Sequence, residues 1–184
     1  MLIEDVLTEF KRTHLEHIED IILYDGFDGG KRVVDYFRAL LVTLQGTSAE
    51  SMSVSVKWDG APAVVCGVNP DNGKFFVGTK SVFAQNAKVN YTKRDIAKNH
   101  GTEELGQKLL KCLVHLKKLN IQGVVQGDLL FTDDDITRKN IANVPHITFT
   151  PNTITYAVPE DSDLGRQIDR AKVGIIFHTY YACL

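Results

Sequence analysis

The first part of the chain carries apolar residues at helical spacing. Positions three or four residues apart form one apolar face, which is typical of an amphipathic helix, and they are Ile3, Val6, Leu7, Phe10, His14, Leu15, Ile18, Ile21 and Ile22. Residues 25–30 interrupt this pattern with three glycines and two aspartates, a composition typical of a turn. This segment lacks the length and the closing glutamate of a calcium loop. A second apolar face over residues 33–44 then ends near Gly46, so we expect an antiparallel helical pair over residues 1–46.

After a polar linker at residues 46–51, the hydrophobic pattern changes to the alternation of β-strands. It predicts strands at residues 52–57, 63–68, 75–79, 121–131, 147–149, 153–158 and 173–181. Helical spacing returns at residues 102–119 and again at residues 161–172, whereas residues 81–92 have no clear period and are expected to form a loop. The sequence therefore predicts an α+β protein with two domains, a helical pair at residues 1–46 and a mostly antiparallel sheet domain at residues 51–184.

Composition limits the classes of partner. The chain has 184 residues, 43% hydrophobic and 24% charged, with a net charge of −2, so any nucleic-acid contact must come from a local patch. No apolar run approaches the roughly 20 residues of a membrane span, so we expect no membrane partner. Acidic residues near Met1 argue against a signal peptide. The three cysteines are scattered and indicate reduced thiols in a cytoplasmic protein. Nothing identifies the partner of the helical pair.

The most informative chemistry lies at residues 57–60, Lys-Trp-Asp-Gly, between two predicted strands. A lysine at the end of a strand beside a sharp turn would be held on a rigid element, as a nucleophilic lysine requires. The same four residues also fit an ordinary surface lysine on a hairpin. Taken alone, these residues leave both interpretations open.

The wider pattern resembles that of the covalent nucleotidyltransferases, which include ATP-dependent DNA ligases, RNA ligases and mRNA capping enzymes. Residues 57–60 resemble their motif I, and residues 75–81 resemble motif Ia with Lys80 in place of arginine. Residues 124–131 resemble motif III with Asp128 in place of glutamate, and residues 173–178 resemble motif IIIa with Phe177 followed by His178 where aspartate is common. The sequence around Lys57 is most similar to that of RNA-ligase-like proteins of large tailed bacteriophages.

This resemblance implies a ligase adenylation fold, similar to that of ATP-grasp proteins, and a site for ATP and Mg²⁺. Lys57 would attack the α-phosphate and become a lysyl–AMP, with Asp59 shaping the turn or helping to hold the metal. Val56, Lys57 and Gly60 would contact the nucleotide, the backbone beside Lys57 recognising the base edge. The remaining implied contacts are Lys80 with phosphate, Asp128 with the ribose or metal, and Phe177 stacked on the purine. The acceptor would be an RNA or DNA end in the host cytoplasm.

Motifs IV and V have no match before Leu184, so the resemblance predicts a domain that breaks off early. Two functions remain open: an ATP-dependent polynucleotide ligase, or a catalytically incomplete nucleotide-binding or structural phage protein that retains the ligase fold. From the residues alone, Phe177 is expected in a core and Trp58 is expected to pack. The three aspartates at 133–135 are expected to form a solvated turn with one helix-capping aspartate, in preference to a metal site.

Overall fold

The computed structural model describes residues 7–9, 17–46 and 56–183 of an α+β protein. The described residues divide into two compact units, which are considered separately. One unit contains residues 17–46 together with residues 56 and 57, and the other contains residues 7–9 and 58–183. None of the described helices combines the length and the hydropathy that a membrane-spanning helix requires.

The smaller unit is built on α1 (Ile18–Leu44), which is bent where Gly26 leaves the helical conformation at φ 56° and ψ −128°. A positive φ of this size is easily reached only by glycine, so the bend follows directly from the sequence. Gly29 lies near the bend and is buried. A Cβ at this position would collide with the carbonyl of Ile21, so the close packing here requires glycine. The interruption expected at residues 25–30 is thus a bend at Gly26, and one bent helix stands in place of the expected antiparallel helical pair.

The helix predicted from Ile3 onward is wrong for the described residues Leu7–Glu9, which form strand β1. This strand pairs antiparallel with the end of β8 (Val173–Cys183), with Leu7 opposite Cys183 and Glu9 opposite Tyr181. An open sheet edge offers backbone partners that a helical pattern does not reveal, so tertiary pairing overrides the local pattern. The rest of the predicted first turns, residues 1–6 and 10–16, lie outside the described residues.

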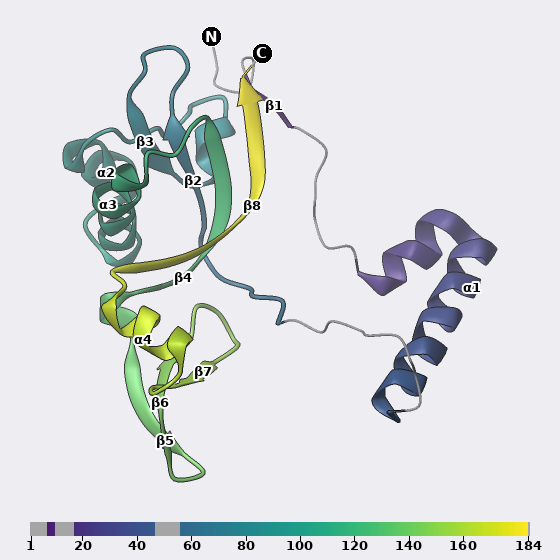
Figure 1. The fold of residues 1–184 in the computed structure, drawn as a ribbon. Coiled ribbons are helices and arrows are strands. Elements are labelled where there is room, and N and C mark those ends of the chain that lie inside the picture. Colours follow the sequence, from purple (N-terminus) through teal and green to yellow (C-terminus); the bar gives the residue numbers. More distant parts are fainter. Residues whose placement is uncertain (1–6, 10–16, 47–55, 184) are drawn as a thin grey trace. The chain divides into compact units, whose positions relative to one another are not determined.

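The larger unit contains a five-stranded sheet in the order β1-β8-β4-β2-β3, with every neighbouring pair antiparallel (Figure 1). Besides β1 and β8, its strands are β2 (Ala63–Val68), β3 (Phe75–Gly78) and β4 (Val124–Thr132). These strands confirm the alternation found at residues 63–68, 75–79, 121–131 and 173–181. Strands β4 and β2 are mostly buried, because side-chain cores cover both faces of this part of the sheet.

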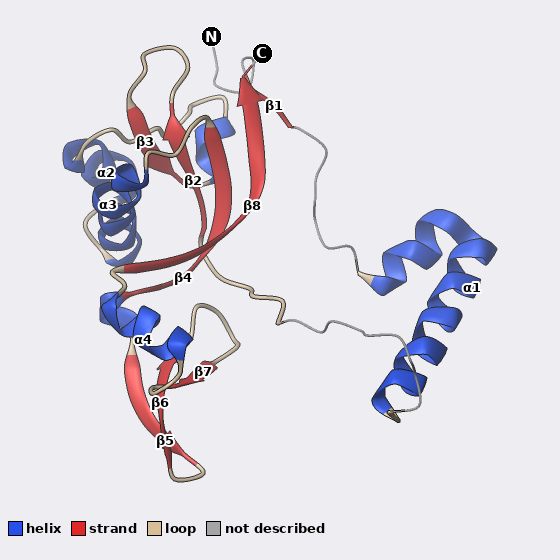
Figure 2. Ribbon diagram, in the orientation of Figure 1, coloured by secondary structure: helices blue, strands red, loops and turns tan. Residues whose placement is uncertain are grey.

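One face of this sheet packs against α2 (Lys93–His100) and α3 (Glu104–Leu116), as Figure 2 shows. Its core consists of Val64, Cys66, Val77, Ile96, Leu109, Cys112, Leu113, Leu116 and Leu129. Cys66 and Cys112 are free thiols inside this core, and burial raises the pKa of each to about 12. Among the described cysteine side chains, the prediction of reduced thiols is therefore confirmed. The opposite face carries Val65, Phe76, Val82 and Val124, beside the short helical turn η2 (Lys80–Phe83).

A second, three-stranded sheet lies at the far end of β4, in the order β5-β6-β7. Its strands are β5 (Thr137–Ile141), β6 (Val144–Phe149) and β7 (Tyr156–Pro159), and α4 (Asp163–Arg170) packs against it. The last two strands confirm the predicted hairpin, and Ser162 caps α4 as expected by accepting a bond from the Gly165 N–H. Leu130 and Phe131 of β4 belong to the core of this second sheet, so β4 joins both sheets.

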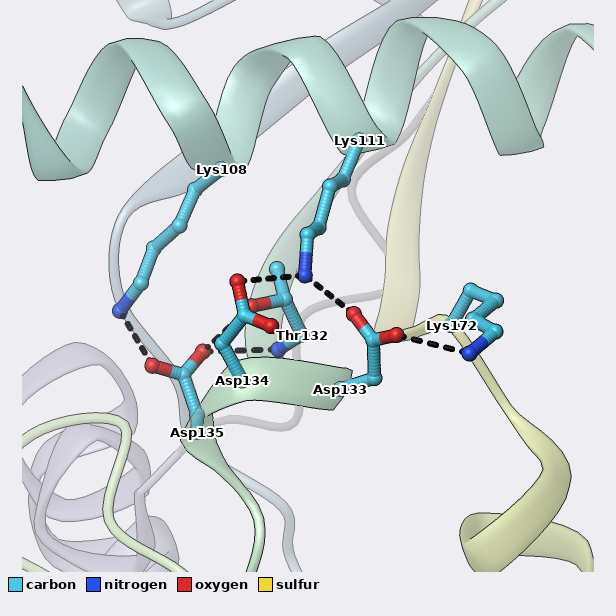
Figure 3. A network of polar contacts seen from close by, with 7 residues as sticks. All are labelled: Lys108, Lys111, Thr132, Asp133, Asp134, Asp135 and Lys172. Atoms are coloured by element: carbon cyan, nitrogen blue, oxygen red, sulfur yellow. Dashed lines mark hydrogen bonds and ion pairs between the residues drawn. The ribbon is translucent and has the colours of Figure 1, made fainter.

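The aspartate triplet forms a short turn, η4 (Asp133–Asp135), between β4 and β5, with lysines around it (Figure 3). Asp135 accepts bonds from the N–H and the hydroxyl of Thr132, so Thr132 is the N-cap and Asp135 takes the third position of a capping box, where an N-cap aspartate was expected. Lysines of α3 neutralise the triplet: Lys108 contacts Asp135 at 3.2 Å, and Lys111 contacts Asp133 and Asp134. Residues 133–135 therefore fasten α3 to the end of β4, and they are less solvated than the sequence suggested.

Candidate functional site

The turn after Lys57 is anchored on the second sheet. The Trp58 ring packs against Phe149 and Tyr156, with ring centroids 4.9 Å apart for the Tyr156 pair, so the prediction that Trp58 packs is confirmed. Tyr156 Oη accepts a bond from the Asp59 N–H at 2.8 Å and donates to the Asp59 carbonyl at 3.1 Å. Asn152 donates to the Asp59 carboxylate at 3.0 Å. Asp59 is therefore fixed in the turn by three bonds, as its expected turn-shaping role requires.

The same turn lies directly against β4 beside Asp128. A Cβ on Gly60 would collide with the carbonyl of Leu129, so only glycine allows this approach. Leu129 N–H donates to the Pro62 carbonyl at 3.1 Å, and Ala63 is the ladder partner of Asp128. Backbone contacts on both sides therefore hold residues 60–63 next to Asp128. Two segments about 65 residues apart in sequence, which resemble motifs I and III, meet at this point.

Asp128 shares its surroundings with His178 of β8. His178 Nε2 lies 3.6 Å from Asp128 Oδ1, and His178 Nδ1 lies 2.8 Å from Thr179 Oγ1. The β4–β8 ladder shifts register between Gln126, which pairs with Thr179, and Gly127, which pairs with Phe177, so that the irregularity falls at His178, and such a bulge re-aims side chains. Both side chains of the pair are partly accessible, at 28% for Asp128 and 19% for His178. The pair therefore combines partial burial with access for a ligand.

Gln126 and Tyr181 are further polar residues on this sheet, and together with Asp128 and His178 they are called here the polar strip. Tyr181 Oη donates to Gln126 Oε1 at 2.9 Å, and Gln126 is itself buried. Gln126 lies two residues before Asp128 on β4, so both side chains project from one face of the sheet. This face is opposite to the one that packs on α3, because Leu129 and Val125 belong to the α3 core.

Phe177 is separated from Asp128 by the strand register. The ladder pairs Phe177 with Gly127 and Ile176 with Asp128, so the residue that shares the face of Asp128 is Ile176. Phe177 is 38% exposed, which corrects the expectation from the residues alone that it lies in a core. The stacking role that the resemblance implies for Phe177 finds no support in this register.

Lys57 and Val56 lie in an extended loop, so the expected strand end at Lys57 is wrong, while residues 52–55 lie outside the described part. Lys57 Nζ lies 3.5 Å from His17 Nε2, and both belong to the smaller unit. Lys80 is exposed at the start of η2, after the edge strand β3. The expected convergence of Lys57 and Lys80 on Asp128 stays a prediction.

No group of three or more His, Cys, Asp or Glu side chains is placed to hold a metal ion among the described residues. Mg²⁺ needs less, because it is usually bound by one or two carboxylates together with substrate phosphates. Asp128, partly accessible beside the Gly60 turn, suits that kind of ligation. Its chemistry therefore fits a metal ion that arrives with a phosphorylated substrate.

A comparison with family models places the chain. A family of unknown function (DUF6267) matches residues 12–183. The chain belongs to this family. Neither a curated protein nor a solved structure gives a significant match. The match to DUF6267 covers α1 as well as both sheets, so the helical element is part of what defines the family's sequence.

Sequence reasoning missed three residues of this DUF6267 site. His178 had a usable signal, because it stands where aspartate is common in the motif that residues 173–178 resemble. Asn152 and Tyr156 had none, because they hold Asp59 from about 95 residues away through contacts that only the fold creates. The site in this DUF6267 chain is therefore the Gly60 turn, Asp128 and His178, supported by the second sheet.

Proposed function

We propose that this protein is an ATP-dependent covalent nucleotidyltransferase of the polynucleotide-ligase kind, with Lys57 as the residue that receives the nucleotide. The observation that carries the proposal is the seating of the Gly60 turn against Leu129, which brings the segment after Lys57 beside Asp128. A solvent-exposed hairpin would not require glycine at this position, because its backbone would not contact a central strand. The order of the four motif-like segments supports the same function, because the strands that carry three of them, β3, β4 and β8, belong to one sheet.

In the proposed reaction, Lys57 Nζ attacks the α-phosphorus of ATP in line with the leaving group. An N–P bond forms, the bond from the α-phosphorus to the bridging oxygen breaks, and pyrophosphate leaves with that electron pair. The amine gives up its proton to solvent or to the departing phosphate, because only a neutral amine is nucleophilic. Mg²⁺ would supply positive charge to the phosphates. The lysyl–AMP would then pass its nucleotide to the 5′-phosphate end of RNA or DNA.

The chain's own residues have distinct parts in this proposal. Asp128 would accept a hydrogen bond from the ribose or hold the metal, and His178 at 3.6 Å would orient that carboxylate. Tyr156 holds the backbone of Asp59 and Asn152 donates to its carboxylate, so the part of Asp59 is to hold the turn in shape. Lys80, exposed on η2, would meet phosphate charge.

A second function is nucleotide binding without transfer. It is favoured by the contact of Lys57 Nζ with His17 Nε2 at 3.5 Å, which gives the lysine a partner within its own unit. In this case the chain would bind ATP through the Asp128 face and form no covalent product.

Incubation with ATP labelled at the α-phosphate, in the presence of Mg²⁺, tests the proposal. We expect a covalent adduct that is labile in acid and stable in alkali, as a phosphoramidate is, and that is absent from Lys57→Ala. Lys139→Ala is the matched control, because Lys139 is an exposed lysine on β5. Calorimetry separates the second function: ATP binding on the order of tens of micromolar, about −6 kcal/mol, without any adduct supports it. An adduct that persists in Lys57→Ala rejects Lys57.

A further inference from the structure

A concentration of positive charge lies outside the polar strip around Asp128. Residues 74–100 contain six Lys or Arg residues and one acid, Asp95, a net charge of +5 in a chain whose total is −2. The remaining residues therefore carry −7. A local excess of this size gives one surface a sign opposite to that of the whole molecule.

Five of these cations form one exposed surface, called here the basic ridge: Lys80, Lys88, Lys93, Arg94 and Lys98. Hydrogen bonds connect the segments that carry these cations. Lys88 N–H donates to the Ser81 carbonyl at 3.1 Å, next to Lys80, and Lys88 Nζ donates to the Asn99 carbonyl at 3.3 Å, next to Lys98. Arg94 and Lys98 are four residues apart on α2, so they lie on the same side of that helix.

The ridge is rigidly supported. Asn90 is fully buried, donates to the Val77 carbonyl at 2.8 Å and accepts from the Asn99 amide at 2.9 Å. Thr92 and Asp95 cap the start of α2 reciprocally. A fixed array of cations loses less conformational entropy on binding than a flexible tail does.

The ridge cations differ in their partners from the basic groups of the same unit that form ion pairs. Lys108, Lys111 and Lys172 are neutralised by the aspartate triplet, and Arg138 is neutralised by Glu160 and Asp169. In the described part of the chain, no carboxylate lies within 4 Å of a ridge cation. Unneutralised exposed cations on a rigid support are what a polyanion requires.

We propose that the basic ridge binds the phosphate backbone of a nucleic acid, without recognition of base sequence. The choice of nucleic acid as the polyanion rests on the proposed ligase function, whereas the location rests on the ridge itself. Aromatic rings near the ridge are engaged elsewhere: Tyr91 packs on Phe76 and bonds to Asn69, and Phe83 packs on Tyr181. Phosphate contacts without stacking or base-edge contacts fix position and carry no sequence information.

An anionic membrane fits this surface less well. Helices that bind membrane surfaces insert an apolar face. The one large apolar residue of α2, Ile96, is 2% exposed and belongs to the core under the helix. The ridge therefore offers charge alone.

Fluorescence anisotropy with a labelled single-stranded RNA of about 20 nucleotides, longer than the about 4–16 that one small binding domain covers, is the direct test. The test variant is Lys88→Gln with Arg94→Gln and Lys98→Gln. Its matched control is Lys31→Gln with Lys139→Gln and Arg170→Gln, which removes the same charges from α1, β5 and α4, where all three are exposed. The probe is also used as single-stranded DNA of the same sequence.

We expect the ridge variant to bind at least about tenfold more weakly at 0.1 M salt, and its slope of log K against log salt to become shallower by about 2, since each single-strand phosphate contact contributes about 0.7. The control variant should bind within twofold of the unmodified protein. Lys93→Gln with Arg94→Gln and Lys98→Gln keeps the Lys88 bond to Asn99 and should behave like the ridge variant. The proposal is overturned if the ridge variant and the control variant weaken nucleic-acid binding equally. It is also overturned if neither the RNA probe nor the DNA probe binds at low salt.

Two further arms separate this proposal from the proposed function. The ridge variant should still form the Lys57 adduct with ATP, and Lys57→Ala should still bind RNA. If neither the unmodified protein nor the ridge variant forms an adduct, but RNA binding still depends on the ridge, the ligase function fails and the ridge proposal stands. Vesicles containing phosphatidylserine and polyglutamate serve as other polyanions: preferential, ridge-dependent binding to either of them instead of nucleic acid overturns the proposal.

Discussion

Two groups of carboxylates lie along the same stretch of chain, and their surroundings differ. Asp133, Asp134 and Asp135 at the end of β4 meet Lys108, Lys111 and Lys172 within ion-pair distance. Asp128, in the middle of β4, meets His178 at 3.6 Å. The triplet lies at a junction between α3, β4 and β8. Asp128 lies where Gly60 brings the backbone of its turn close to Leu129 of the strand.

This difference separates a structural use of charge from a functional one. Carboxylates held by several ammonium groups have little remaining capacity for a ligand. A partly exposed carboxylate beside a histidine keeps lone pairs for a ribose hydroxyl or a metal ion. The number of aspartates in the sequence favours the triplet as a site, but the contacts favour the single Asp128.

Gly60→Ala gives the largest effect, because it removes the close approach that places the Gly60 turn beside Asp128. The added methyl group collides with the Leu129 carbonyl, so the turn or β4 must shift. We expect the free energy of unfolding to fall by about 1–3 kcal/mol, measured by urea denaturation, and the ATP adduct to disappear. Gly30→Ala is the control: open space surrounds Gly30 inside α1, so it should stabilise slightly. Unchanged stability and labelling in Gly60→Ala would show that this contact does not form the site.

Asp128→Asn tests the functional carboxylate. We expect ATP to bind about tenfold more weakly, a loss of about 1.4 kcal/mol, because the amide cannot replace the charge toward a metal ion. The free energy of unfolding should change by less than about 0.5 kcal/mol, since Asp128 is partly exposed and surface changes are usually small. Asp134→Asn, in the triplet, should leave ATP affinity unchanged by calorimetry. Loss of affinity in Asp134→Asn with none in Asp128→Asn would reverse the comparison.

Ile176→Ala and Phe177→Ala test the register on which the Asp128 face depends. Ile176 is the ladder partner of Asp128, whereas Phe177 pairs with Gly127. We expect Ile176→Ala to weaken ATP binding a few-fold and Phe177→Ala to weaken it less, measured in the same calorimetric titration. A larger loss in Phe177→Ala, approaching the about 1–3 kcal/mol of base–aromatic stacking, would restore the stacking role that the resemblance implies and contradict the register.

Much of the fold could be predicted from the sequence where the hydrophobic period is strong. The alternation in β2, β4 and β8 and the helical face of α3 correspond closely to the structure. Helix α2 was not predicted, although Thr92 and Asp95, three residues apart, carried the signal of a reciprocal cap that begins it. Strand β1 carried no such signal, because three residues become a strand only when β8 offers an edge.

The candidate site was predictable only in part. The residue types of motif I identified the turn, and the Gly-Asp pair identified Asp128. Which side chains share a face with Asp128 depends on a bulge between Gln126 and Gly127, and a shift of one residue moves every side chain to the other face. Neither this bulge nor the bonds from Asn152 and Tyr156 to Asp59 leave a pattern in the sequence.

Asp133→Asn gives the smallest effect and tests the structural carboxylates. Bonds from Lys111 and Lys172 lower the pKa of Asp133 to about 2, against about 3.9 in an unfolded chain. A lowered folded-state pKa means that Asp133 stabilises the fold fully above about pH 4 and loses this contribution as the pH falls through about 2.

At pH 7 we therefore expect Asp133→Asn to lower the free energy of unfolding by about 0.5–1 kcal/mol, the range of a partly exposed ion pair. The difference from the unmodified protein should shrink between pH 4 and pH 2, measured by urea denaturation across that range. Asp134→Asn should cost less at pH 7, because the Asp134 side chain is 72% exposed and pairs with Lys111 alone among the described lysines. If Asp133→Asn instead left stability unchanged and weakened ATP binding, the triplet would be the ligand site and Asp128 the structural residue.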